Sequence, residues 1–186
     1  MYTDDERALL LEAARESIGH GLDRGRALPL DPRDYPQRLR EPRASFVTLE
    51  IEGTLRGCIG ALEAYQPLIA DVAEHAFAAA FHDPRFPPLA PPELSALELH
   101  ISVLGLPEPL DCAVEEELLA QLRPGIDGLI LECGRQRATF LPTVWESLPE
   151  PRQFLAHLRR KAGLAPDYWS ERIRWQRYQV EAVTAG

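Results

Sequence analysis

Apolar residues in the first part of the chain recur every three or four positions, as an amphipathic helix requires. Thr3 and Glu6 form a capping box that begins this helix, and Gly19 and Gly21 are expected to end it. The apolar positions are Leu9, Leu10, Ala13, Ala14 and Ile18. Four prolines between residues 22 and 42 then predict an extended segment lying over the surface.

The period changes to two in the next part of the chain. Residues 44–52 and 55–62 alternate apolar with polar positions, which predicts a hairpin with Gly53 and Thr54 as its turn. An alanine-rich helix is expected from Pro67 to Phe81, packed closely against the sheet. Residues 97–103 alternate again and predict a half-buried strand with His100 on its polar face.

The second half of the chain mixes helical and strand-like patterns in the same way. We expect a short acidic helix, a hairpin, a short helix, a longer helix and a closing strand at residues 114–122, 129–141, 142–148, 154–164 and 172–180. Helices and hairpins are interspersed without a regular βαβ repeat. The pattern therefore predicts an α+β fold with a mainly antiparallel sheet and flanking helices.

Length and charge limit the classes of protein. The 186 residues suffice for a single domain over residues 1–186, within which two subdomains can share the chain. The formal charge of −9 argues against nonspecific binding to nucleic acid or to anionic membranes. The acidic N-terminus and the lack of an apolar run of about 18 residues predict a cytoplasmic protein.

The cysteine and glycine patterns predict no cofactor. Three cysteines without CxxC spacing do not indicate a disulfide framework or a zinc finger. No phosphate loop and no dinucleotide fingerprint is present. Metal binding by Cys58, His75 and His82 is disfavoured, because no HExxH motif or close histidine pair supports it.

The segment Leu55-Arg56-Gly57-Cys58-Ile59-Gly60 is the strongest candidate for a site. Strand alternation puts Arg56, Cys58 and Gly60 on one face, with Arg56 and Cys58 about 6 to 7 Å apart. A guanidinium at that distance can favour the thiolate, and Gly60 leaves room for a bound group. In the alternative interpretation, Cys58 is a small buried residue and Arg56 is a salt-bridge partner that joins two elements.

A thiol nucleophile needs a base, and the following helix offers two candidates. His75 and His82 lie seven residues apart, and Asp71, four residues before His75, could orient it. The catalytic candidates are therefore Cys58, His75 and His82. A solvated helix face carrying an ordinary Asp71–His75 pair is the favoured alternative.

The next loop combines an acid, a cation and an aromatic ring in Asp83, Arg85 and Phe86. Prolines stiffen this loop, which could form a rim for an anionic or planar ligand. An intramolecular clamp between Asp83 and Arg85, with Phe86 buried, explains the same residues equally well.

Five segments together resemble the AMMECR-one domain family, and most closely its prokaryotic branch, AmmeMemoRadiSam system protein A. Their order and spacing match across almost the whole chain. The segments are residues 55–60, 78–89, 101–108, 138–142 and 154–164.

The resemblance implies a single α+β domain with a larger and a smaller subdomain, and it puts the segment 56–60 near a cleft between them. It also implies a set of proteins that includes a Memo-like protein and a radical S-adenosylmethionine enzyme. By this likeness, the ligand-binding positions are in two groups: Arg56, Gly57, Cys58 and Gly60, and, as a second rim, Asp83, Arg85 and Phe86.

Three functions follow as hypotheses. The first is an accessory or partner module of such a radical enzyme system, which uses the Arg56/Cys58 face to hold a ligand or partner. The second is a thiol-dependent transferase or hydrolase with Cys58 as nucleophile. The third is a motif that only stabilises the fold. The substrate and the oligomeric state stay open.

Overall fold

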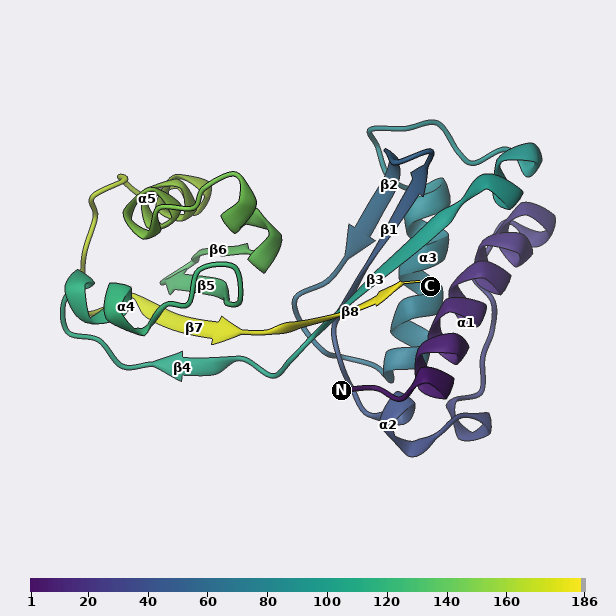
Figure 1. Ribbon diagram of the computed structural model, residues 1–186, viewed down its shortest axis with the longest axis horizontal. Coiled ribbons are helices and arrows are strands. Elements are labelled where there is room, and N and C mark those ends of the chain that lie inside the picture. Colours follow the sequence, from purple (N-terminus) through teal and green to yellow (C-terminus); the bar gives the residue numbers. More distant parts are fainter. Residues whose placement is uncertain (185–186) are drawn as a thin grey trace. The chain divides into compact units, whose positions relative to one another are not determined.

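The computed structural model describes residues 1–184 and divides them into two compact units (Figure 1). Of the described residues, unit 1 contains 1–104 and 181–184, and unit 2 contains 105–180. Each unit has its own four-stranded sheet and its own hydrophobic core. Helices flanking antiparallel strands confirm the predicted α+β class.

Unit 1 is built on a sheet with the strand order β2-β1-β3-β8. Its strands are β1 (Ser45–Ile51), β2 (Thr54–Gly60), β3 (Glu98–Leu104) and β8 (Val180–Thr184). Its helices are α1 (Asp4–Arg24), η1 (Pro32–Asp34), α2 (Gln37–Arg40), α3 (Leu68–Phe81) and η2 (Pro91–Ala96). The short turns η1 and α2 lie in the segment that was expected to be extended.

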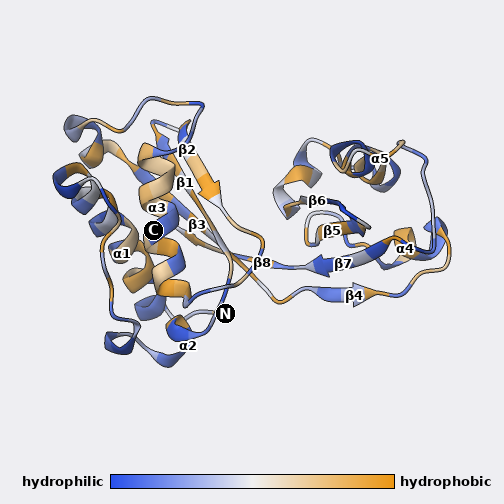
Figure 2. Cartoon of the chain, turned by 180° about the vertical axis from the view of Figure 1, so that it is seen from behind, coloured by the Kyte–Doolittle hydropathy of each residue, from blue (hydrophilic) through white to orange (hydrophobic). Residues whose placement is uncertain are grey.

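One face of this sheet is covered by helices. The helix α3 packs against β1 and β2, and α1 packs against α3 and β3. In Figure 2, α3 is coloured largely as hydrophobic, which fits a helix that contacts both a sheet and another helix. The opposite face, which we call the polar face, carries half-buried side chains of β1, β2 and β3: Phe46, Thr48, Glu50, Cys58, His100 and Ser102.

The helix α1 is longer than the sequence predicted. It continues through Gly19 and Gly21 to Arg24 and ends at Gly25, which has a left-handed φ of 69°. A Cβ atom at Gly21 would lie 2.5 Å from the ring of Phe81, so this glycine serves helix packing and not termination. No helix in the described part of the chain is both long and apolar enough to cross a membrane.

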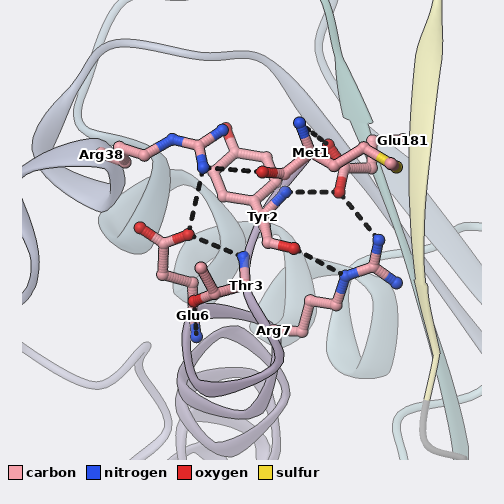
Figure 3. A network of polar contacts seen from close by, with 7 residues as sticks. All are labelled: Met1, Tyr2, Thr3, Glu6, Arg7, Arg38 and Glu181. Atoms are coloured by element: carbon pink, nitrogen blue, oxygen red, sulfur yellow. Dashed lines mark hydrogen bonds and ion pairs between the residues drawn. The ribbon is translucent and has the colours of Figure 1, made fainter.

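The predicted capping box of α1 is confirmed and belongs to a larger polar network (Figure 3). The Thr3 hydroxyl accepts a hydrogen bond from the Glu6 amide at 3.2 Å. Glu181 of β8 accepts hydrogen bonds from the Tyr2 amide at 2.7 Å and from Arg7 at 2.9 Å. These contacts join the start of α1 to a strand near the other end of the chain.

The predicted hairpin of β1 and β2 is present, but its turn is displaced by one residue. Glu52 and Gly53 have left-handed φ values of 52° and 70°, and β2 begins at Thr54. Two left-handed residues suit the right-handed twist of a two-residue hairpin. The register shifts between Leu49 and Glu50.

Unit 2 has the strand order β4-β7-β5-β6. Its elements are β4 (Glu108–Leu110), α4 (Glu115–Gln121), β5 (Gly128–Cys133), β6 (Gln136–Phe140), η3 (Pro142–Glu146), α5 (Pro151–Lys161) and β7 (Arg174–Tyr178). The β5–β6 hairpin was predicted. The expected single closing strand at residues 172–180 is instead two strands, because β7 ends at Tyr178 and β8 joins the sheet of unit 1.

Candidate functional site

Cys58 lies in a row of three side chains on the polar face of unit 1. Thr48 of β1 is paired with Cys58 on β2 and with His100 on β3. The Thr48 hydroxyl donates a hydrogen bond to the Cys58 sulfur at 3.2 Å. Strand alternation had placed Cys58 and His100 on polar faces, but only the pairing of the strands puts them in one row.

The loop after α3 is anchored to the backbone of Cys58. The Asp83 carboxylate accepts hydrogen bonds from the Cys58 amide at 2.9 Å, from the Arg85 amide at 3.1 Å and from the Arg85 guanidinium at 2.7 Å. Asp83 is only 4% exposed. Hydrogen bonds from Arg85, together with those from the two amides, outweigh burial and hold the pKa of Asp83 well below its usual range.

Arg85 combines a fixed position with exposure. Asp83 holds its Nε and Nη2 atoms, and Nη2 also lies 3.5 Å from the Cys58 carbonyl oxygen. The side chain is nevertheless 54% exposed, and its guanidinium lies 5.5 Å from the centre of the Phe86 ring. The intramolecular clamp considered for this loop is therefore present, although Phe86 is only half-buried.

Arg56 joins β2 to the segment that leads into β3. Its Nε and Nη2 atoms donate to the two carboxylate oxygens of Glu93 at 2.7 and 3.1 Å, and Nη2 also donates to the Pro87 carbonyl. These hydrogen bonds lower the pKa of Glu93. Arg56 thus makes the structural salt bridge of the alternative interpretation, while its contact with a ligand stays a prediction.

The two glycines of the segment are both in close contact with other parts of unit 1. A Cβ atom at Gly57 would lie 2.1 Å from the Ala79 carbonyl oxygen, so the backbone of α3 makes the predicted close approach. At Gly60 a Cβ atom would lie 2.3 Å from the Phe46 ring. The expectation that Gly60 leaves room for a bound group is wrong, because this ring fills the space.

His75 lies on the other side of the sheet from Cys58. Its Nδ1 atom is 3.1 Å from Asp71, which also accepts a hydrogen bond from the Ser45 hydroxyl at 2.6 Å. Asp71 is 0% exposed and His75 is 7% exposed, so the expectation that this pair lies on a solvated helix face is wrong. Ser45 points toward α3, whereas Cys58 is paired with Thr48 on the polar face. The structure therefore does not bring His75 and Cys58 together.

His82, the second candidate base, caps the C-terminal end of α3 and is exposed. Its ring contacts the edge of the Phe77 ring, with the centroids 4.9 Å apart. Phe77 in turn lies against α1, where it approaches Gly21. The neighbours that the structure gives to Cys58 are Thr48, Asp83 and Arg85.

Comparisons with known proteins agree over most of the chain. The AMMECR1 family model matches residues 11–183. A protein from Methanothermobacter thermautotrophicus is 40% identical over 183 residues, which are 95% of this chain and 93% of that protein. A protein from Thermofilum pendens is 40% identical over 180 residues, covering 89% of this chain and 82% of the relative.

A solved structure extends the likeness to the fold. The crystal structure of an uncharacterized protein from Pyrococcus horikoshii has a TM-score of 0.84 and 34% sequence identity, and the match covers 97% of this chain and 91% of that one. The family match and the structural match thus both include residues of unit 1 and of unit 2. The chain belongs to the AMMECR1 family.

Proposed function

We propose that this protein is an accessory module of an enzyme system with a Memo-like protein and a radical S-adenosylmethionine enzyme, and that it holds a partner segment or ligand beside Cys58. The observation that carries the proposal is Arg85, whose guanidinium is held by Asp83 next to Cys58 while 54% of the side chain is exposed. The enzyme partners come from the family resemblance, whereas the binding surface comes from the contacts of Arg85.

The surface proposed to contact the partner is centred on Arg85, whereas the sequence suggested the Arg56/Cys58 face. Arg56 is engaged by Glu93 and only 12% exposed, so Arg85 and Phe86 supply the accessible groups. A guanidinium has five N–H donors in a planar fork, and the Asp83 contacts use Nε and Nη2, so Nη1 can donate to an incoming acceptor. This chemistry suits an acidic side chain or a carbonyl oxygen, with a planar group against Phe86.

The binding proposal predicts the result of a pull-down experiment. Immobilised wild-type protein should retain the Memo-like protein or the radical enzyme, and Arg85→Ala should weaken that binding by roughly tenfold or more, because a charge-assisted hydrogen bond is lost. The matched control is Arg26→Ala, which removes an exposed arginine elsewhere in unit 1. Thermal unfolding of each variant checks that the fold is kept. Retention of neither enzyme by the wild-type protein would contradict the proposal.

A thiol-dependent transferase or hydrolase is the second candidate function. The Thr48 hydroxyl donates a hydrogen bond to the Cys58 sulfur, and the Arg85 guanidinium lies 3.5 Å from the Cys58 carbonyl oxygen. A nearby cation is one of the features that can activate a cysteine. The base that such an enzyme needs is the weaker part of this hypothesis, since His75 is bonded to Asp71 on the far side of the sheet.

Iodoacetamide labelling near neutral pH separates the two functions. Under the accessory-module proposal, Cys58 should react within a few-fold of the rate of Cys133, because no base assists it. Cys112 should be the slowest, because burial and the nearby Glu117 and Asp111 raise the pKa of its thiol. Cleavage of the labelled protein and mass spectrometry resolve the three sites. A Cys58 rate more than roughly tenfold above that of Cys133, reduced again in Thr48→Val, would favour the enzyme.

A further inference from the structure

We propose that Glu50, Glu98 and His100 form a binding site for a divalent metal ion on the polar face of unit 1. One carboxylate oxygen of each glutamate and one ring nitrogen of His100 lie within 4.8 Å of one another. The site is formed by β1 and β3 and is independent of the function proposed for Arg85 and Cys58. His100 was recognised in the sequence only as a residue on a polar strand face.

The sheet places two negative charges directly opposite each other. Glu50 of β1 is paired with Glu98 of β3. Carboxylates in this arrangement repel and destabilise a sheet unless a positive charge lies between them. His100 follows Glu98 by two residues, so its side chain is on the same face and diagonal to Glu50. Both acids and the imidazole therefore converge on one point.

In the described part of the chain, neither of the two acids is paired with an arginine or a lysine. Within residues 1–184, the one basic group that pairs with either of these glutamates is His100, whose Nε2 atom is 3.4 Å from Glu50. That nitrogen is shielded from solvent and has no hydrogen-bond partner in the described part of the chain. A bound cation would interact with both carboxylates and with this shielded ring nitrogen, which lacks a hydrogen bond.

The ligand types select the class of metal. Imidazole nitrogen with carboxylate oxygen suits Zn²⁺ and related divalent transition metals, with bonds of about 2.0 to 2.2 Å. Such bonds put tetrahedral ligand atoms about 3.4 Å apart. His100 Nε2 and the Glu50 carboxylate already lie 3.4 Å apart, so it is the carboxylate of Glu98, an exposed side chain, that must approach them. Three protein ligands also leave one coordination position open for water or another molecule.

The metal site lies on the same face as Cys58. Thr48 separates His100 from Cys58 in one row across the strands. Two strand spacings of about 4.8 Å put Cys58 about 10 Å from His100. A metal bound by the two glutamates and His100 would thus lie on the same face as the thiol, but too far from it for the sulfur to be a ligand.

Zinc binding to the full chain tests this inference. Protein treated with a chelator and then dialysed is titrated with zinc chloride in a calorimeter, and one equivalent should bind. His100→Ala should weaken the binding by about 100-fold, and Glu50→Gln and Glu98→Gln by about tenfold each, because each removes one ligand. The matched controls are His157→Ala and Glu12→Gln, which remove exposed residues outside the site and should leave the affinity unchanged.

Stability without metal gives a second measurement that does not depend on affinity. In the metal-free protein, Glu98→Gln should raise the melting temperature, because it removes the repulsion between the paired acids. With zinc present, the wild-type melting temperature should rise, whereas that of Glu98→Gln should rise less or not at all. A larger rise in the wild-type protein than in Glu98→Gln is what a metal held between the two glutamates predicts.

Three results would contradict the inference. No binding of zinc, cobalt or manganese by the wild-type protein would overturn the inference. Binding that survives His100→Ala but is lost in Cys58→Ser would assign the metal to the thiol and would overturn it too. A lower melting temperature for metal-free Glu98→Gln would mean that the paired acids do not repel each other in the metal-free protein, which would contradict the inference.

Discussion

Gly57→Ala is expected to lower the free energy of unfolding by about 3 kcal/mol or more, which is large for a single methyl group. The added Cβ would lie 2.1 Å from the Ala79 carbonyl oxygen in α3. That oxygen is a backbone atom and cannot rotate away as a side chain could. The helix must move off β2, which loosens its packing over the core of unit 1.

The control for this prediction is Gly53→Ala in the hairpin turn. A Cβ atom there has no other atom within 4 Å, but the φ of 70° is unfavourable for alanine. We expect a smaller loss of about 1 to 2 kcal/mol from backbone strain alone. Equal losses in the two variants would show that α3 does not press on Gly57.

Urea unfolding should be followed by far-ultraviolet circular dichroism as well as by fluorescence. The tryptophans Trp145, Trp169 and Trp175 all belong to unit 2, so their fluorescence reports on that unit. Circular dichroism includes the long helices of unit 1. The lower stability of Gly57→Ala must appear in the transition followed by circular dichroism. If the transition followed by fluorescence shifts as well, the two units unfold cooperatively.

Only part of the structure of segment 55–60 could be predicted from the sequence. Two glycines in a strand correctly indicated a close approach, and the alternation correctly put Cys58 and Gly57 on opposite faces. The pattern did not say what approaches, because the contact with Ala79 depends on how α3 lies across the strand. A local period describes the faces of one element and not the position of its neighbour.

The histidines show the same limit. Residues Asp71 and His75 were recognised as a helical pair, but they are buried because α3 packs against β1, where Ser45, 26 residues away from Asp71, donates a hydrogen bond to the Asp71 carboxylate. A solvated pair and a buried one have the same spacing in the sequence. Likewise, Glu50 and Glu98 become neighbours only through the pairing of β1 with β3, a contact between strands that the chain does not connect directly.

The loop from Asp83 to Phe86 was the most predictable part of the site. A short-range clamp between an acid and an arginine two residues apart follows from local geometry, and it is present. The hydrogen bond from the Cys58 amide to Asp83 was not predictable, because it joins residues 25 positions apart. This bond is what makes the loop part of the Cys58 site.

Asp83→Asn is therefore expected to destabilise the protein by about 2 to 3 kcal/mol at neutral pH. The amide keeps the shape of the side chain but replaces one acceptor oxygen by a donor, in a place where Cys58 and Arg85 present only donors. At 4% exposure, water cannot readily replace the lost partners. Urea unfolding at pH 7 measures the difference from the wild-type protein.

The pH dependence of that difference tests the charge itself. The folded protein holds the pKa of Asp83 below its usual range, whereas the unfolded chain has the ordinary value of about 3.9. The carboxylate therefore contributes its full stability at neutral pH and loses it as the pH falls below about 4 toward the lowered value. The wild-type advantage over Asp83→Asn should accordingly be smaller at pH 3 than at pH 7.

A second clamp in the chain supplies the matched control. Asp31 accepts hydrogen bonds from Arg33 through the same atoms, and the pKa of Asp31 is likewise lowered, to about 2, by those bonds. Asp31 and Arg33 lie on the surface, so water can replace either partner, and Asp31→Asn should change stability little. Hydrogen exchange of the Cys58 amide should quicken in Asp83→Asn only. If both variants lose equal stability, or the loss at Asp83 does not vary with pH, the buried carboxylate does not hold the loop to Cys58.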